Sequence, residues 1–365
     1  MALQLGLVGL PNVGKSTLFN ALTRAGATVA NYPFTTIDPN IGVVPVPDPR
    51  LDRIAEIIRP QEVVPATLRV VDIAGLVKGA SHGEGLGNQF LSHIRAVDAI
   101  AMVVRCFQDE NIAHVTASLD PVDDIETVQL ELILSDLELV ERQIERVQGR
   151  AKANPREYAG ELEALESLAR RLRAGEGLRR AELSPAEHEA SAAVDLLTTK
   201  PLLYVANVEE GDLPQGGELA RRVAAVAAAQ GAPLVTLCAA LEAELIEWEP
   251  AEARAYAQEL DLQRAGLERF IEVGYSLLDY ITFFTTTGGK EVRAWNLLRG
   301  QTALEAAGRI HTDMARGFIR AEVVHFDALD RAGSLAHARE AGALRLEGRD
   351  YVVQDGDVLH IRFNV

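Results

Sequence analysis

The stretch Gly9-Leu10-Pro11-Asn12-Val13-Gly14-Lys15-Ser16-Thr17 follows the apolar run Leu5-Gly6-Leu7-Val8 and decides the fold. It predicts a strand, a phosphate-binding loop and a helix, because its two end glycines let the backbone curl with its N–H groups toward phosphate oxygens. Lys15 is expected to reach the β- and γ-phosphates, and Ser16 to offer its hydroxyl to Mg²⁺. The helix that begins near Lys15 adds the positive end of its dipole. The pattern predicts binding of a nucleoside triphosphate, but it names neither the base nor the reaction.

The overall composition is typical of a globular protein with a sizeable core. The chain has 365 residues, of which 48% are hydrophobic and 24% charged, and this length favours about two or three domains. No apolar run approaches the roughly 18 residues of a membrane span, and residues 1–4 contain no charged leader. We therefore expect a cytoplasmic protein without a membrane partner. Cys106 and Cys238 end strand-like runs, where buried thiols are expected rather than a disulfide.

The net charge of −17 is unevenly distributed along the chain. From Tyr280 onward, 11 Lys and Arg residues balance 11 Asp and Glu residues, so the whole acidic excess lies before Tyr280. A protein this acidic is not expected to wrap nucleic acid with its entire surface. The C-terminal segment is electrostatically distinct, which favours a partner of its own.

Two segments after the phosphate loop supply candidate metal ligands. The connection Asn31-Tyr32-Pro33-Phe34-Thr35-Thr36-Ile37 is expected to close over the nucleotide, with Thr36 as the second protein ligand of Mg²⁺; an ordinary loop with solvated threonines is the alternative. The β-rich run 66–72 ends in Asp72, which is followed by Ile73-Ala74-Gly75. In this Asp-x-x-Gly arrangement the carboxylate of Asp72 holds Mg²⁺ through water, and the N–H group of Gly75 meets the γ-phosphate.

The water-positioning group is harder to assign. Leu76 stands where a Ras-like enzyme carries the glutamine that orients the attacking water, so this task must be done differently. The glycine-rich stretch 79–87 is typical of a switch segment that orders around a γ-phosphate, although a surface loop has the same composition. His114 is the nearest titratable candidate, because it lies in a loop after the apolar strand 97–105. A solvated loop histidine is the alternative.

The pattern changes to a helical period from Leu130 onward. Apolar residues recur at alternating spacings of three and four in two runs separated by Asn154-Pro155, and Gly175-Glu176-Gly177 ends the second run. Two antiparallel helices would bury these stripes against each other as a coiled-coil arm, unless the stripes pack on the main sheet instead. Ser184-Pro185-Ala186-Glu187 then predicts a capped helix start. The stripe residues are Leu130, Ile133, Leu137, Val140, Ile144 and Val147 in the first run, and Leu162, Leu165, Ala169 and Leu172 in the second.

The base-recognition motif departs from that of GTPases. The buried-strand pattern 200–207 ends in Asn207-Val208-Glu209-Glu210, where GTPases carry Asn-Lys-x-Asp and use the aspartate to bind guanine. The longer Glu210 cannot make the same paired contact, so guanine discrimination should be weakened or lost. Cys238-Ala239-Ala240 follows another strand and matches the small-residue loop that lines a base pocket. Strands and helices alternate around these landmarks, which predicts an α/β fold with a doubly wound, mostly parallel sheet.

The segment from Tyr280 onward predicts a small α+β unit. Its expected strands are 281–285, 291–295, 321–326, 351–353 and 358–363, with a helix near residues 304–314. Asp355-Gly356-Asp357 indicates a hairpin between the last two strands. Aromatic side chains beside Arg309, Arg316 and Arg320 could face RNA or protein, or the arginines could simply be solvated.

Taken together, these motifs resemble those of the YchF (Obg-like ATPase) family over the whole chain. The resemblance implies a TRAFAC-class P-loop NTPase with a nucleotide domain (1–128 and 199–279), an inserted coiled-coil domain (129–198) and a C-terminal TGS, or β-grasp, domain (280–365). It further implies ATP hydrolysis in preference to GTP, Mg²⁺ as cofactor, and a monomer that associates with ribosomes (the large subunit or the 70S particle) and with RNA through the TGS and coiled-coil surfaces. By position, the phosphates would be held by Asn12, Val13, Gly14, Lys15, Ser16 and Thr17, Mg²⁺ by Ser16 and Thr36, and the base by Asn207 and Val208, with Cys238 and Ala239 lining its pocket.

Several functions remain open at the level of sequence. The chain is either a slow ATPase whose hydrolysis drives a switch, or a ribosome- or RNA-binding scaffold with a structural nucleotide and negligible turnover. A GTP-preferring GTPase is a further alternative. A small-molecule kinase fits less well, because the Asp-x-x-Gly arrangement at Asp72 and the glycine-rich stretch after it suit a switch better than a second-substrate site.

Overall fold

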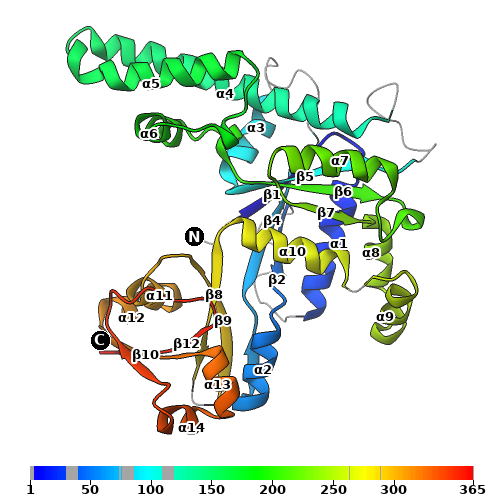
Figure 1. Ribbon diagram of the computed structural model, residues 1–365, viewed down its shortest axis with the longest axis vertical. Coiled ribbons are helices and arrows are strands. Elements are labelled where there is room, and N and C mark those ends of the chain that lie inside the picture. The colour runs from blue at the N-terminus through cyan, green and yellow to red at the C-terminus, as the bar shows by residue number, and fades with distance from the viewer. Residues whose placement is uncertain are drawn as a thin grey trace. The chain divides into compact units, whose positions relative to one another are not determined.

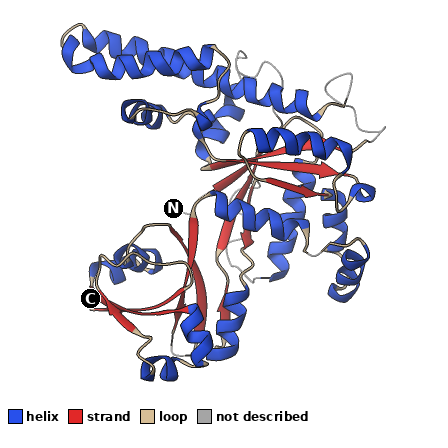
Figure 2. Cartoon of the chain, viewed as in Figure 1, coloured by secondary structure: helices blue, strands red, loops and turns tan. Residues whose placement is uncertain are grey.

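The computed structural model describes residues 4–29, 40–73, 75, 86–108, 119–262, 264–287 and 289–364. The chain forms two compact units, the first from residues 1–24, 36–42 and 69–270 and the second from residues 25–35, 43–68 and 271–365. Figure 1 labels the elements and Figure 2 separates strands from helices. In the part of the chain that the structure describes, no helix has the length and apolar content needed to cross a membrane.

The first sheet has six strands in the order β2-β4-β1-β5-β6-β7 (Figure 1). The neighbours from β4 to β7 are joined in parallel. Every residue of β5 and β6 is buried, as expected for strands covered on both faces, and the doubly wound α/β prediction is confirmed. The strands are β1 (Gln4–Val8), β2 (Ile41–Pro45), β4 (Thr67–Asp72), β5 (Ala99–Cys106), β6 (Leu202–Val208) and β7 (Leu234–Leu237).

Helices alternate with these strands along the chain. Several begin with proline directly after a capping residue; the side chain of Asp120, for example, accepts a hydrogen bond of 2.9 Å from the N–H group of Val122 at the start of α4. The helices are α1 (Lys15–Val29), α3 (Leu86–Ala96), α4 (Pro121–Ala151), α5 (Pro155–Arg173), α6 (Pro185–Val194), α7 (Gly217–Ala229), α8 (Ala239–Leu245), α9 (Pro250–Glu259) and α10 (Gly266–Leu277), with short 3₁₀ turns η1 (Leu178–Arg180), η2 (Leu197–Thr199) and η3 (Glu210–Asp212).

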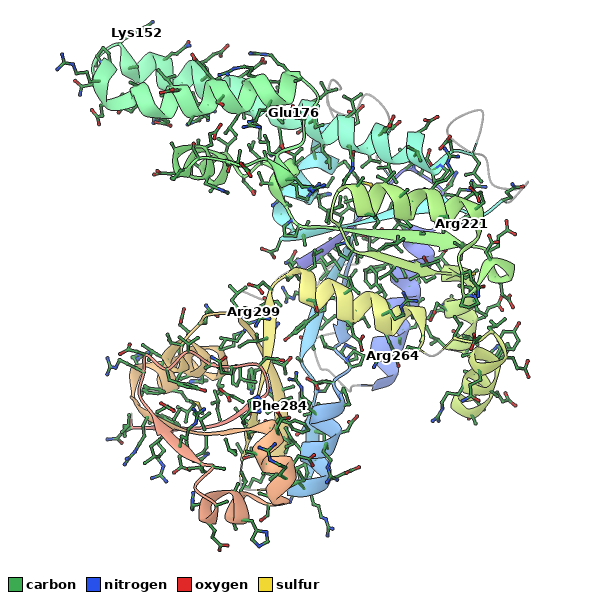
Figure 3. All side chains as sticks on the ribbon, viewed as in Figure 1. Lys152, Glu176, Arg221, Arg264, Phe284 and Arg299 are labelled. Atoms are coloured by element: carbon green, nitrogen blue, oxygen red, sulfur yellow. The ribbon has the colours of Figure 1, made fainter. Side chains whose placement is uncertain are left out.

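The predicted helical arm is present. Helices α4 and α5 lie side by side, and Lys152 marks the turn between them, whereas Glu176 follows the other end of α5 (Figures 1 and 3). Their apolar stripes form one buried cluster with Leu178 and parts of α6. Leu130 departs from the predicted stripe, since it is 49% exposed near the start of α4. The capping box at Ser184 is confirmed by its reciprocal hydrogen bonds with Glu187.

The second sheet has the strand order β11-β10-β12-β8-β9-β3 and covers an apolar core that includes Phe283 and Ile361. Its strands are β3 (Glu62–Val64), β8 (Tyr280–Thr286), β9 (Glu291–Leu298), β10 (Phe318–His325), β11 (Arg345–Glu347) and β12 (Asp357–Phe363). Its helices are α2 (Pro49–Ile58), α11 (Ala303–Ile310), α12 (Thr312–Arg316), α13 (Phe326–Ala332) and α14 (Leu335–Glu340).

The expected C-terminal hairpin is wrong. Residues 351–353 contribute only an isolated bridge, between Val352 and Thr302, and β12 pairs with β10 and β8 instead. The turn before β12 is held by a side chain: the buried carboxylate of Asp357 accepts hydrogen bonds from the hydroxyl of Tyr351 (2.7 Å) and the N–H group of Gln354 (2.9 Å). A carboxylate that satisfies the turn in this way replaces the backbone ladder that a hairpin would need.

Candidate nucleotide-binding site

A cavity of about 680 Å³ opens beside the phosphate loop in the first unit. This volume is within the range of small-molecule sites, which is roughly 300–1,000 Å³. Its walls come from the segments that follow β1, β5, β6 and β7, and ligands of parallel sheets bind at these carboxyl ends. The residues predicted for nucleotide binding that line the cavity are Asn12, Gly14, Lys15, Ser16, Thr17, Asn207, Val208, Cys238 and Ala239. Val13 is buried beneath this surface.

The backbone conformation of the phosphate loop requires glycine at position 14. Gly14 has φ +93°, and a Cβ atom there would lie 2.2 Å from Nδ2 of Asn207, so a larger residue is excluded both by conformation and by space. Asn12 also has positive φ, at 63°. The carbonyl of Gly14 accepts the first hydrogen bond of α1, from the N–H group of Leu18 at 3.0 Å. The loop therefore leads directly into the helix, whose positive end would favour an anion bound at the loop.

The side chain of Lys15 is buried against the phosphate loop. Its Nζ donates hydrogen bonds to the carbonyl oxygens of Leu10 (2.7 Å) and Gly9 (3.0 Å), and the side chain is only 6% exposed. Burial lowers the pKa of Lys15 to about 8, and the negative charge of Asp72 partly opposes this shift. A cation held mainly by neutral carbonyls gains strongly when a phosphate arrives.

Ser16 and Asp72, which are predicted Mg²⁺ ligands, lie next to each other. The hydroxyl of Ser16 donates a hydrogen bond of 3.1 Å to Oδ2 of Asp72. The other carboxylate oxygen, Oδ1, is buried and has no hydrogen-bond partner among the described residues. Burial raises the pKa of Asp72, against the opposing effects of Ser16 and Lys15. A serine hydroxyl beside a buried, underused carboxylate oxygen fits the oxygen ligands of Mg²⁺.

Asn207 connects two loops of the site. Its Nδ2 donates to the carbonyl of Val13 and its Oδ1 accepts from the N–H group of Ala239, both at 2.9 Å. The sequence predicts that Asn207 binds the base, and Asn207 lines the cavity. The structure adds a contact across 194 positions of sequence that no local pattern indicates.

The cavity is also lined by residues that were not predicted from the sequence to bind nucleotide. Phe107 follows β5 and lines the cavity. The guanidinium of Arg105 lies over its ring, with Cζ of Arg105 4.7 Å from the ring centroid of Phe107. Glu209 accepts a hydrogen bond of 2.6 Å from the N–H group of Gln108. Glu210 accepts one from the hydroxyl of Tyr256 on α9. The Glu210 position was singled out by its motif, whereas nothing in the local sequence indicated Tyr256.

Gly75 lies close to the phosphate loop. A Cβ atom on it would lie 3.0 Å from backbone atoms of Pro11, so the glycine allows the two segments to approach. The other predicted switch and catalytic residues, Thr36, Leu76 and His114, lie outside the described residues. Their roles stay predictions.

The comparisons with known proteins cover the full chain. A family model named YchF-GTPase_C and described as a protein of unknown function (DUF933) matches residues 280–364, and a model described as a 50S ribosome-binding GTPase matches residues 4–136. Two similar proteins are named ribosome-binding ATPase YchF: one from Bacillus subtilis (strain 168), 51% identical, and one from Escherichia coli O157:H7, 50% identical, both aligned over 100% of each chain. The solved YchF GTPase of Schizosaccharomyces pombe is 38% identical with a TM-score of 0.89, covering 99% of this chain and 97% of that one.

Proposed function

We propose, because this chain belongs to the YchF family, that it is a slow Mg²⁺-dependent ATPase whose nucleotide state controls its association with the ribosome. Two relatives carry ATPase and ribosome binding in their names, whereas the solved relative is titled a GTPase. The choice of nucleotide is therefore the part of this proposal that depends most on the chain's own site.

The observation that carries the proposal is that Lys15 and Ser16 line a nucleotide-sized cavity, with Asp72 hydrogen-bonded to Ser16. Lys15 is desolvated and positioned by two carbonyl groups, so its charge is available to phosphate oxygens. Ser16 and Asp72 would supply oxygen ligands, since Oδ1 of Asp72 has no hydrogen-bond partner among the described residues and could bind the ion or its water. Bound Mg²⁺ would neutralise charge that develops on the phosphate oxygens during transfer.

Adenine fits the other end of the cavity better than guanine. Guanine presents hydrogen-bond donors at N1 and N2, and a free carboxylate at the last position of the base motif would accept hydrogen bonds from both. Adenine presents an acceptor at N1. A free carboxylate facing it would find no hydrogen-bond donor there. Here the carboxylate of Glu210 is already engaged by Tyr256, and that of Glu209 by the backbone of Gln108. We therefore propose ATP as the preferred substrate and GTP as the weaker one.

The remaining expectations form part of the same proposal. A ribosome-bound role places the protein in the cytoplasm, and the arm and the C-terminal segment would offer surfaces to the ribosome or its RNA. We keep the three-part division at residues 128/129, 198/199 and 279/280, the TGS assignment and the monomeric state as proposals. Leu76, in place of a water-orienting glutamine, favours slow turnover.

Steady-state phosphate release, measured with and without ribosomes, tests the proposal. We expect slow ATP turnover that requires Mg²⁺ and changes when ribosomes are added, and weaker turnover with GTP. The scaffold alternative predicts tight nucleotide binding with no measurable release in either condition. Lys15→Ala is the control, because a contaminating ATPase would remain active in a preparation of that variant.

A further inference from the structure

Glu210 is not free at the mouth of the cavity. It begins the turn η3 directly after β6, and its carboxylate accepts a hydrogen bond from the hydroxyl of Tyr256, which lies 46 residues later on α9. Glu210 borders the cavity beside Glu209 and Val208. Glu210 is exposed and Tyr256 is half-buried, and neither belongs to the buried core.

Helix α9 holds Tyr256 in place through a second contact. The ring of Tyr256 lies 5.4 Å from that of Trp248, at an angle of 54°, and Trp248 precedes the helix in the segment that follows α8. Glu247, next to Trp248, pairs with Arg24 on α1 at 2.6 Å. The tyrosine hydroxyl is therefore presented to Glu210 by a segment that is attached to the rest of the unit.

The carboxylate of Glu210 interacts differently with a purine when it is free and when it accepts the hydrogen bond from Tyr256. A free Glu210 has rotamers in which it can approach the base edge, where it would accept from guanine and repel the N1 lone pair of adenine. A Glu210 engaged by Tyr256 has one oxygen already used and its side chain directed toward α9. The hydrogen bond thus removes a group that would favour guanine.

We infer that Tyr256 is a positioning residue for nucleotide choice: it holds Glu210 away from the purine edge and thereby favours adenine over guanine. The inference rests on the proposed function, since it concerns the base end of the same site. The hydrogen bond to Glu210 is also the main reason that the pKa of Tyr256 is raised, so the phenol keeps its proton and stays a donor across the neutral range.

The test compares binding of Mg·ADP and Mg·GDP by isothermal titration, which avoids turnover during the measurement. Tyr256→Phe removes only the hydroxyl and keeps the ring that contacts Trp248, so the fold should be retained. We expect this variant to reduce the ratio of adenine to guanine affinity by about fivefold, the size of a charge-assisted hydrogen bond discounted for exposure. Tyr158→Phe on α5 makes the same chemical change at a residue that does not line the cavity, and this matched control should keep the wild-type ratio.

The same change in a Glu210→Ala background separates positioning from a direct effect. Without the carboxylate, Tyr256→Phe should leave the affinity ratio unchanged. The inference is overturned if the single variant keeps the wild-type ratio, or if the fivefold loss persists in the Glu210→Ala background. If the wild type prefers GDP, the adenine preference of the proposed function is overturned. If the wild type prefers ADP and Tyr256→Phe has the same ratio of ADP to GDP affinity, only this inference is overturned.

Discussion

The side-chain amide of Asn207 donates a hydrogen bond of 2.9 Å to the carbonyl oxygen of Val13, so the end of β6 holds the phosphate loop. Asn207→Asp keeps the shape of the side chain but replaces the donor with a carboxylate that faces this carbonyl. We expect a loss of about 1–3 kcal/mol in the free energy of unfolding, because a buried charge and acceptor would be left unpaired. Nucleotide affinity should fall with it, since the loop loses its support.

Thermal unfolding and isothermal titration on Asn207→Asp measure these two effects. Asn364→Asp, at an exposed position near the C-terminal end of the described residues, makes the same chemical change and should leave both quantities at the wild-type level. An Asn207→Asp protein as stable as the wild type, with unaltered affinity, would show that the link to Val13 does not support the loop.

Lys15→Ala should abolish useful ATP affinity without unfolding the protein. The ammonium group bonds loop carbonyls beside the cavity, where water can replace it, but no neutral group can replace its charge at the phosphates. We expect affinity to fall by about 100-fold or more, the size of a charge-assisted contact in a partly buried site. Titration with ATP and a circular dichroism melt measure the two quantities. Lys152→Ala, at the tip of the arm, is the control; a folded Lys15→Ala protein that binds ATP normally would remove Lys15 from the phosphate site.

The parts of the fold that the sequence predicts are those encoded by local patterns. The phosphate loop follows from its glycines and lysine, the buried strands from apolar runs, and the arm from an apolar stripe with a period near 3.5. The stripe fails only at Leu130, close to the start of α4. Helix α4 also contacts β5 and α7, so its early positions follow the packing against these two elements rather than the pairing with α5.

The parts that could not be predicted depend on contacts between distant segments. Asn207 joins Val13 across 194 positions, and Tyr256 reaches Glu210 from an exposed helix whose sequence carries no motif. The predicted C-terminal hairpin failed for a related reason, because the buried carboxylate of Asp357 satisfies the turn that a strand ladder was expected to hold. Side-chain hydrogen bonds of this kind have no signature in residue spacing.

Asp72→Asn should remove most of the Mg²⁺ dependence of ATP binding. The change deletes the negative charge beside Ser16 while preserving an acceptor oxygen for its hydroxyl. Replacing a group that orients a metal ligand typically costs about 10- to 100-fold in metal affinity, so we expect the ratio of ATP affinities with Mg²⁺ and with EDTA to shrink about tenfold. Titrations in the two buffers give this ratio. The exposed variant Asp261→Asn should keep the wild-type ratio, and an unchanged ratio in Asp72→Asn would exclude Asp72 from the metal site.

The stability of the first unit should depend on pH through Glu242 on α8. Its carboxylate is 6% exposed and accepts a hydrogen bond of 2.6 Å from the N–H group of Gly266. Burial raises the pKa of Glu242, against the opposing effect of N–H groups at Gly266 and Leu267. The folded state therefore binds its proton more tightly than the unfolded state, and the stability due to the protonated form is lost as pH rises through the folded-state pKa.

Glu242→Gln removes this titration and keeps an acceptor for Gly266. The melting temperature of the variant minus that of the wild type should therefore increase as pH rises from about 5 to 8, whatever its sign at pH 5. Differential scanning calorimetry over this range provides the slope. A flat difference for Glu242→Gln would mean that the buried carboxylate ionises as freely as in the unfolded chain.

The base motif should be convertible toward guanine by two changes made together. Glu210→Asp shortens the side chain so that it no longer reaches the hydroxyl of Tyr256 and regains the paired acceptor geometry suited to guanine N1 and N2. Val208→Lys restores the residue that GTPases carry at this position. Val208 lines the cavity, so the aliphatic stem of lysine can extend along the cavity wall.

We expect the double variant to shift the ratio of ATP to GTP affinity toward GTP by about tenfold, since a carboxylate that accepts two donors from guanine finds none on adenine. Competition binding with both nucleotides measures the ratio in the wild type, the two single variants and the double variant. Val208→Lys alone should change it little, because lysine supplies no group for the guanine donors. A double variant that keeps the wild-type ratio would mean that adenine is selected by contacts other than the fourth position of the motif, and the argument from Glu210 would then fail.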